Sequence, residues 1–173
     1  MKLFFYGTLM DPDVLAVVTG GQLPPDMEEA FLHGFRRTYL ARLSYPLLVA
    51  HPAGRVAGIL AHGLDAEAVH RLMVFEGSEY HLVPVPVTTH EGHLIRVGTF
   101  LCDRRMQTDN RDWRLPVWQR RHKRLFLRRA EVLMRRYGTQ ARLARMPSGL
   151  PILAPKEPKF LFGKPPALWR FVG

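Results

Sequence analysis

The order of strand-like and helix-like segments predicts an α+β fold with a long basic helix and a tail at its C-terminal end. Residues 3–6 form a short apolar and aromatic run that ends at Gly7, which is typical of a buried strand. Helix signals and further strand-like segments then follow one another over residues 11–102. Residues 115–137 place apolar side chains at helical spacing among many arginines, which predicts a long amphipathic helix.

The length of 173 residues is enough for one domain with a full core and an extension. We expect a folded domain over residues 1–103, a basic helix packed on it within 104–138, and a proline-rich basic tail over 139–173. No apolar run approaches the roughly 18–20 residues that span a bilayer, and the N-terminus lacks the features of a signal peptide. The single cysteine, Cys102, excludes an internal disulfide, so we expect a cytoplasmic protein.

The net charge of +10 is unevenly distributed along the chain. Residues 1–103 hold 7 Lys/Arg and 11 Asp/Glu, a net charge of −4, whereas residues 104–173 hold 18 Lys/Arg and 4 Asp/Glu, a net charge of +14. A mildly acidic body therefore carries a strongly basic C-terminal part. Such a part can bind nucleic acid or an anionic membrane surface, and an arginine-rich helix face can equally be merely solvated.

Local signals outline the elements between residues 11 and 62. Asp11 is suited to cap a helix that begins at Pro12 and ends at Gly20. Residues 30–43 predict a strand interrupted at Gly34. Tyr45-Pro46 opens a strand over 47–50, a turn is expected at 51–54, and a strand follows over 55–62, in which Gly58 marks a bulge or a close backbone approach.

The next segment is a predicted helix over residues 66–75, with Asp65 as its cap. Its expected buried face holds Ala66, Val69, Leu72 and Met73. A strand over 80–89 contains prolines two residues apart, which predicts an edge or a bulge. A turn at 91–92 leads into the last expected strand, 94–102.

The C-terminal part begins with an expected polar link over residues 104–112. The long helix should follow from about Leu115 to Tyr137, with Pro116 in its first turn and Gly138 at its end. Residues 139–173 show no clear periodicity and are expected to be an extended tail.

Glu76 is the most informative single residue. It follows a helix and precedes a glycine, where a solvated carboxylate is the ordinary role, although the helix dipole disfavours a negative charge there. If Glu76 points into a cavity instead, burial would raise its pKa toward that of a useful general base.

Other chemical motifs are weaker. The sequence from His90 to His93 imitates a zinc motif, but its histidines are three residues apart at a turn, whereas a zincin needs them four apart on a helix. Cys102 lies beside Asp103, which would not lower the pKa of the thiol. We therefore predict no metal site.

Several short motifs together resemble a known family. They are Tyr6-Gly7-Thr8-Leu9 after the first strand, Tyr45-Pro46, the strand segment at 56–58, and Phe75-Glu76-Gly77-Ser78-Glu79-Tyr80. In order and spacing over residues 2–102 the chain resembles the gamma-glutamylcyclotransferase-like (avirulence-induced-gene-like) family. The helix over 113–137 also looks like the C-terminal helix of some bacterial members.

The resemblance implies a small mixed β-barrel with flanking helices, and a cavity between the loop at 6–9 and the helix that bears Glu76. In that cavity Glu76 would be the general acid/base. The substrate would be bound by Tyr6, Gly7, Thr8 and Leu9, largely through backbone N–H groups, and by Tyr45, Pro46 and Tyr80.

The implied reaction needs neither a metal nor a cofactor, because nucleophile and electrophile belong to one molecule. The α-amine of a small γ-glutamyl amine or peptide attacks its own γ-carbonyl, giving 5-oxoproline and a free amine or peptide. The chain has Met73 where many relatives have Asp and Leu82 where they have Arg or Lys. The alternative function is a non-catalytic adaptor on the same scaffold, whose basic C-terminal part binds nucleic acid or another anionic partner.

Overall fold

The computed structural model describes residues 1–102 and 107–144, without the side chains of 139–144. The tail predicted over 139–173 therefore lies mostly outside the described residues. In chain order the elements are β1 (Leu3–Phe5), the 3-10 helix η1 (Thr8–Met10), α1 (Pro12–Thr19), β2 (Asp26–Leu40), β3 (Pro46–His62), α2 (Ala66–Glu76), β4 (Tyr80–Thr89), β5 (Leu94–Cys102), β6 (Thr108–Asp112), α3 (Leu115–Arg121) and α4 (Lys123–Ala144).

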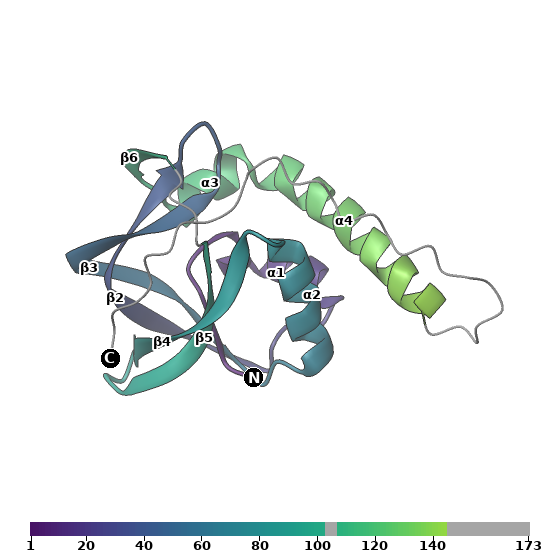
Figure 1. The fold of residues 1–173 in the computed structure, drawn as a ribbon, viewed down its shortest axis with the longest axis horizontal. Coiled ribbons are helices and arrows are strands. Elements are labelled where there is room, and N and C mark those ends of the chain that lie inside the picture. The colour runs from purple at the N-terminus through teal and green to yellow at the C-terminus, as the bar shows by residue number, and fades with distance from the viewer. Residues whose placement is uncertain (103–106, 145–173) are drawn as a thin grey trace.

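Five of the strands close into a mixed barrel (Figure 1). The strand order is β3-β1-β5-β4-β2, and β2 pairs with β3 to complete the circle. β1 pairs in parallel with β5, whereas the other pairings are antiparallel. β6 adds an extra strand to β2 outside the circle. The predicted α+β barrel with flanking helices is confirmed.

β1 lies at the centre because both of its faces are buried. Leu3 and Phe5 belong to the core that the helices cover, whereas Phe4 and Tyr6 belong to a second core made of strand residues. This alternation follows from the two-residue period of a strand. Closure also requires small residues: a Cβ at Gly58 would lie 2.4 Å from the Phe5 carbonyl oxygen, so the expected close backbone approach is confirmed.

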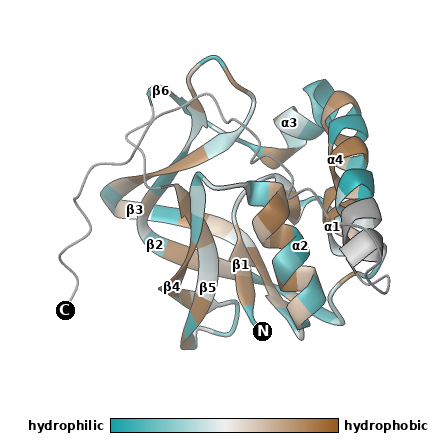
Figure 2. Ribbon diagram, turned by 45° about the vertical axis from the view of Figure 1, so that its right-hand side comes forward, coloured by the Kyte–Doolittle hydropathy of each residue, from teal (hydrophilic) through white to brown (hydrophobic). Residues whose placement is uncertain are grey.

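The helices gather on one side of the barrel (Figures 1 and 2). α1 and α2 begin as predicted, because the Asp11 carboxylate accepts hydrogen bonds from the amides of Asp13 and Val14, and that of Asp65 accepts one from Ala68. The predicted buried face of α2 is only partly right. Leu72 is fully buried, but the Met73 side chain is half exposed, at 51 %.

Two strand predictions need correction or qualification. Residues 51–54 are not a turn, because β3 runs unbroken from Pro46 to His62. These residues lie opposite the interruption at Gly34: the register passes from His33–Arg55 to Phe35–Ala50, so the extra residues form a bulge within the β2–β3 pair. The proline strand β4 pairs with β5 along its length but with β2 only at Thr88 and Thr89, so its middle is an edge, as predicted.

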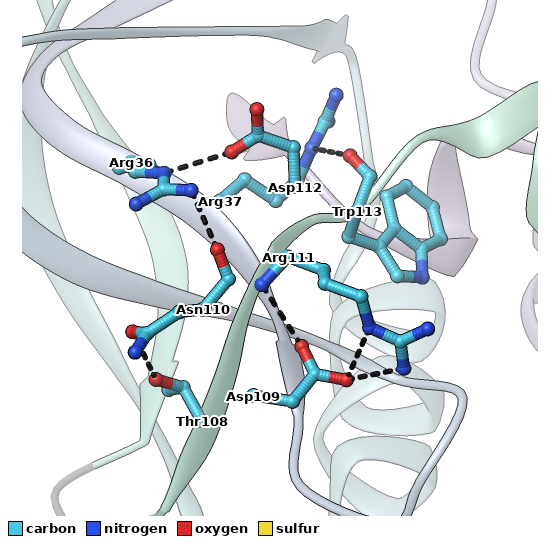
Figure 3. Close-up of polar contacts among 8 residues, drawn as sticks. All are labelled: Arg36, Arg37, Thr108, Asp109, Asn110, Arg111, Asp112 and Trp113. Carbon is cyan, nitrogen blue, oxygen red and sulfur yellow. Dashed lines mark hydrogen bonds and ion pairs between the residues drawn. The ribbon is translucent and has the colours of Figure 1, made fainter.

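The expected polar link contains a strand that the prediction missed. Within it, β6 pairs with the end of β2 (Figure 3). Arg36 holds this strand through bonds from its guanidinium to the Asp112 carboxylate at 2.8 Å and the Asn110 carbonyl at 2.6 Å. Short polar strands of this kind carry no apolar alternation, so periodicity does not reveal them.

The predicted single helix over 115–137 is wrong in two respects. It breaks at His122, which separates α3 from α4, and it continues through Gly138 to Ala144. The break has a tertiary cause. The fully buried Asp11 carboxylate of the α1 cap accepts a hydrogen bond from Gln119 at 2.8 Å and pairs with Lys123 at 2.8 Å, one residue on each side of the break.

This contact fixes the position of α4 on the domain. Burial alone would raise the pKa of Asp11, but hydrogen bonds from Lys123 and Gln119 hold that pKa below its ordinary value. Hydrophobic residues alternate with hydrophilic ones along α4 (Figure 2), and Ala130, Met134 and Tyr137 are buried against the core. In the described residues, no helix is both long and apolar enough to cross a membrane.

Candidate active site

A cavity of about 320 Å³ brings together every residue that the sequence assigned to the site. Glu76 lines it from the end of α2, and Tyr80 from the start of β4. The loop after β1 forms another wall. Pro46, at the start of β3, and Tyr45 just before it also line the cavity. The predicted residues in the lining are Tyr6, Gly7, Thr8, Leu9, Tyr45, Pro46, Glu76 and Tyr80.

The Glu76 carboxyl is buried, and nothing in the described chain compensates its charge. In the described part of the chain, no side chain or amide forms a hydrogen bond or an ion pair with it. Burial raises the pKa of Glu76 from 4.5 to about 7. The residue as a whole is only partly buried because it faces the cavity, but protein surrounds its carboxyl group. Such an arrangement destabilises the fold and is typical of functional sites.

The loop after β1 lines the cavity together with Glu76, and the backbone amides of Gly7, Thr8 and Leu9 donate no hydrogen bond within the described residues. The 3-10 turn uses the amides of the two residues that follow this loop. Met10 donates to the Gly7 carbonyl and Asp11 to the Thr8 carbonyl, each at 3.0 Å. Gly7 has a φ of −121°, so glycine is not needed here to allow a positive φ. A Cβ there would lie 2.8 Å from the Pro46 ring, and the absent side chain therefore lets the loop approach Pro46.

Two tyrosines stand beside the carboxyl. The Tyr6 hydroxyl donates to the Phe100 carbonyl at 2.8 Å, and burial, with the charges of Tyr80 and Glu76, raises its pKa well above the ordinary value. Burial and then the Glu76 charge raise the pKa of Tyr80. Both hydroxyls therefore stay protonated at neutral pH. Among the described residues, none accepts a hydrogen bond from the Tyr80 hydroxyl, so this hydroxyl is available to donate to a bound molecule.

Sequence reasoning missed Arg37, which supports the loop from behind. Its guanidinium donates to the carbonyls of Tyr6 at 2.7 Å, Ala57 at 3.1 Å and Trp113 at 3.3 Å, the last of which is drawn in Figure 3. It also lies over the Trp113 ring at 5.1 Å. Burial lowers the pKa of Arg37 to about 10, so the group remains charged. Arg37 thereby fixes the carbonyl that immediately precedes the site loop.

The prediction also missed that α4 forms a wall of the cavity. Phe126 packs edge-on against Tyr45 and Phe75, with ring centroids 5.7 and 6.0 Å apart. Arg129, Ala130 and Leu133 continue this wall. The helical spacing of the apolar residues over 115–137 already predicted an apolar face, but only the structure shows that this face covers the cavity.

The two departures from the family pattern lie away from the cavity lining. Met73 is exposed on α2, and Leu82 packs against the core that the helices cover. Neither is among the residues that line the cavity. In the described residues, no three His, Cys, Asp or Glu side chains are grouped as metal ligands.

The fold and the cavity define a class first. A solved structure described as a gamma-glutamyl cyclotransferase shares the fold, with a TM-score of 0.51 over 62 % of this chain and 68 % of that one, at 16 % identity. A solution structure of an Arabidopsis thaliana protein is similar over 85 % of this chain and 94 % of that one, with a TM-score of 0.57 and 27 % identity. The protein thus has the gamma-glutamyl cyclotransferase fold.

Comparison of sequences shows the family to which the chain belongs. The family described as "Gamma-glutamyl cyclotransferase, AIG2-like" matches residues 3–120, and the chain belongs to this family. AIG2-like protein A of Arabidopsis thaliana is 29 % identical over 135 residues, 77 % of this chain and 81 % of that protein. AIG2-like protein B of the same plant is 28 % identical over 137 residues, 78 % of each chain.

Proposed function

We propose that the protein is a γ-glutamyl cyclotransferase that releases 5-oxoproline from a small γ-glutamyl amine or peptide. The observation that carries the proposal is the buried Glu76 carboxyl, which has no partner among the described residues and lines the same cavity as the loop at residues 6–9. A pKa of about 7 leaves this group able both to accept and to return a proton near neutral pH.

The reaction follows from these groups. Backbone amides of the loop at residues 6–9 bind the α-carboxylate of the substrate, while Tyr45 and Pro46 close the side of the pocket. Glu76 accepts a proton from the α-ammonium, and the freed amine attacks the γ-carbonyl carbon. The ring C–N bond forms and the original amide C–N bond breaks, while Glu76 returns its proton to the leaving nitrogen. The ring nitrogen gives up its second proton, which the released amine binds, so that the amine leaves as an ammonium.

The remaining contributions are alignment and stabilisation of charge. Folding the substrate so that its amine meets its own carbonyl is worth up to roughly 7–11 kcal/mol when the geometry is ideal. The Tyr80 hydroxyl, which stays protonated and lines the cavity, donates in this scheme to the oxyanion that develops on the γ-carbonyl oxygen. No redox partner or group carrier enters this scheme.

The test is a panel of γ-glutamyl compounds assayed for released 5-oxoproline, with the wild type and Glu76→Gln compared. We expect turnover by the wild type and a loss of at least about 100-fold in the variant, which keeps its fold because Gln has a similar shape. Turnover by the variant at the wild-type rate would show that Glu76 is not the base. No product from any compound would reject the proposed reaction.

A second candidate rests on the charge of the C-terminal helices. Among the side chains described there, seven arginines are exposed: Arg120, Arg121, Arg124, Arg128, Arg129, Arg135 and Arg136. An adaptor that uses this surface would associate with nucleic acid or anionic lipid in a salt-sensitive manner, and deletion of residues 139–173 would weaken that association. Association that is unchanged between low and high salt would reject it.

A further inference from the structure

The wall that α4 contributes to the cavity differs in character from the other walls. Phe126, Arg129, Ala130 and Leu133 occupy positions i, i+3, i+4 and i+7, so they share one face of the helix. Three of them are apolar, and Arg129 is the only lysine or arginine among the described residues that line the cavity. This wall lies beyond residues 3–120, over which the family description matches this chain.

Among the described side chains, Arg129 has no partner that would neutralise it. Its side chain is exposed, and within the described residues no carboxylate pairs with it. Lys123 on the same helix is occupied, because it pairs with Asp11 and Asp13. Because Arg129 is both exposed and part of the lining, it stands at the mouth of the cavity.

The mouth is where the leaving half of a substrate must lie. The γ-glutamyl half has to place its ammonium and carbonyl beside the buried Glu76 carboxyl, and its α-carboxylate is bound by the loop amides. The group beyond the scissile amide is then left to contact α4, where Phe126 and Leu133 offer apolar surface and Arg129 offers positive charge.

We propose that Arg129 determines specificity by binding a carboxylate on the leaving amine. The preferred substrates are then γ-glutamyl amino acids or peptides, rather than γ-glutamyl amines whose leaving half carries no anion. This inference rests on the proposed cyclotransferase function. It assigns Arg129 no part in the chemical step, because the group it binds lies beyond the bond that breaks.

A matched pair of substrates tests the proposal. γ-Glutamyl-alanine and γ-glutamyl-ethylamine differ only in the carboxylate on the leaving half. We expect Arg129→Gln to lower kcat/KM for γ-glutamyl-alanine about tenfold, as for loss of one charge-assisted hydrogen bond, and to leave kcat/KM for γ-glutamyl-ethylamine within about twofold. Arg129→Lys should retain part of the preference. Arg128→Gln, on the same helix but outside the lining, is the control for net charge and should leave both values unchanged.

The outcomes separate this inference from the function on which it rests. Equal losses for both substrates would mean that Arg129 binds the shared α-carboxylate, and no loss for either would make it an ordinary surface charge. Either result overturns the inference and leaves the cyclotransferase standing. No 5-oxoproline from either substrate with the wild type rejects both. Calorimetric binding of γ-glutamyl-alanine to Glu76→Gln, with and without Arg129→Gln, adds a readout without turnover, in which the double variant should bind about tenfold more weakly.

Discussion

At the scale of single residues, the site is held in a state that costs the fold free energy. Glu76 has a pKa of about 7 in the folded protein, against 4.5 in a solvated chain. Between these two values the folded state binds more protons than the unfolded state, so stability falls as pH rises through this window. Below it the carboxyl is protonated in both states and imposes no such penalty.

The first prediction concerns this penalty. Glu76→Gln should raise the free energy of unfolding above pH 7 by up to about 3 kcal/mol, because the amide need not be ionised in the cavity. At pH 4 the difference should nearly vanish. Urea unfolding of both proteins at pH 4 and pH 8 measures it. A difference that does not change with pH would mean that the carboxyl is solvated.

Arg37 provides a second test at this scale. Arg37→Met should lower the free energy of unfolding by about 2–4 kcal/mol, because it removes charged hydrogen bonds to carbonyls from three parts of the chain. It should also lower 5-oxoproline formation by at least about tenfold at temperatures where the variant is still folded, since the Tyr6 carbonyl loses its support.

The matched control for Arg37 is its neighbour. Arg36→Met removes an ion pair to Asp112 whose side chains are 41 % and 56 % exposed, so it should cost no more than about 1 kcal/mol and should not affect turnover. Equal effects of the two substitutions would show that Arg37 has no particular role behind the loop.

Sequence reasoning reached some of these residues and not others. Glu76 and the loop at 6–9 could be found because their motifs are contiguous and resemble a family pattern. Arg37 could not, because its three acceptors are backbone carbonyls from distant segments. Every residue has such a carbonyl, so the sequence does not indicate which ones Arg37 binds. Arg129 was hidden among seven exposed arginines of the same helices.

At the scale of elements, α4 is the feature that changed most between prediction and structure. Gly138 was expected to end the helix, but α4 continues to Ala144, and a Cβ at Gly138 would meet no atom within 4 Å. Gly138→Ala should therefore stabilise the protein by about 0.5–1 kcal/mol, the usual gain from replacing glycine inside a helix. Thermal unfolding followed by circular dichroism measures the change. A glycine that ended the helix in a left-handed conformation would give the opposite sign.

The elements that were predicted well are those fixed by local chemistry. The caps at Asp11 and Asp65 and the end of α2 at Gly77 depend on neighbouring residues alone. Those predicted poorly depend on distant partners. The turn expected at 51–54 is held in a strand by pairing with β2, β6 exists only through β2, and the break at His122 reflects the buried Asp11.

At the scale of the whole molecule, closure of the barrel and attachment of α4 create the cavity. Closure needs β1 in parallel with β5 and β2 beside β3, pairings that no periodicity specifies. The family resemblance supplied the barrel, whereas the position of α4 over the cavity had no sequence signal. The charge asymmetry was visible from the start, and among the described side chains seven exposed arginines lie on α3 and α4, of which α4 also lines the cavity.

Because the cavity and the basic surface use different residues, a variant can distinguish the proposed enzyme function from the proposed adaptor function. Replacing Arg120, Arg121 and Arg124 with Gln should leave 5-oxoproline formation within about twofold of wild type, because none of the three lines the cavity and solvent screens their charge. The same variant should lose salt-sensitive binding to RNA or anionic vesicles if such binding exists. A loss of turnover in this variant would mean that the basic surface, and not the cavity alone, takes part in catalysis.

The most direct test of the central claim is the pH dependence of kcat/KM for 5-oxoproline release. Glu76 must be ionised to accept the proton, so the acidic limb should rise with pH and bend at an apparent pKa near 7. Glu76→Asp, which keeps a carboxyl but moves it, should retain a limb at reduced rate, whereas Glu76→Gln should have none. A wild-type profile that is flat from pH 5 to 8, or that bends near 4.5, would contradict the account.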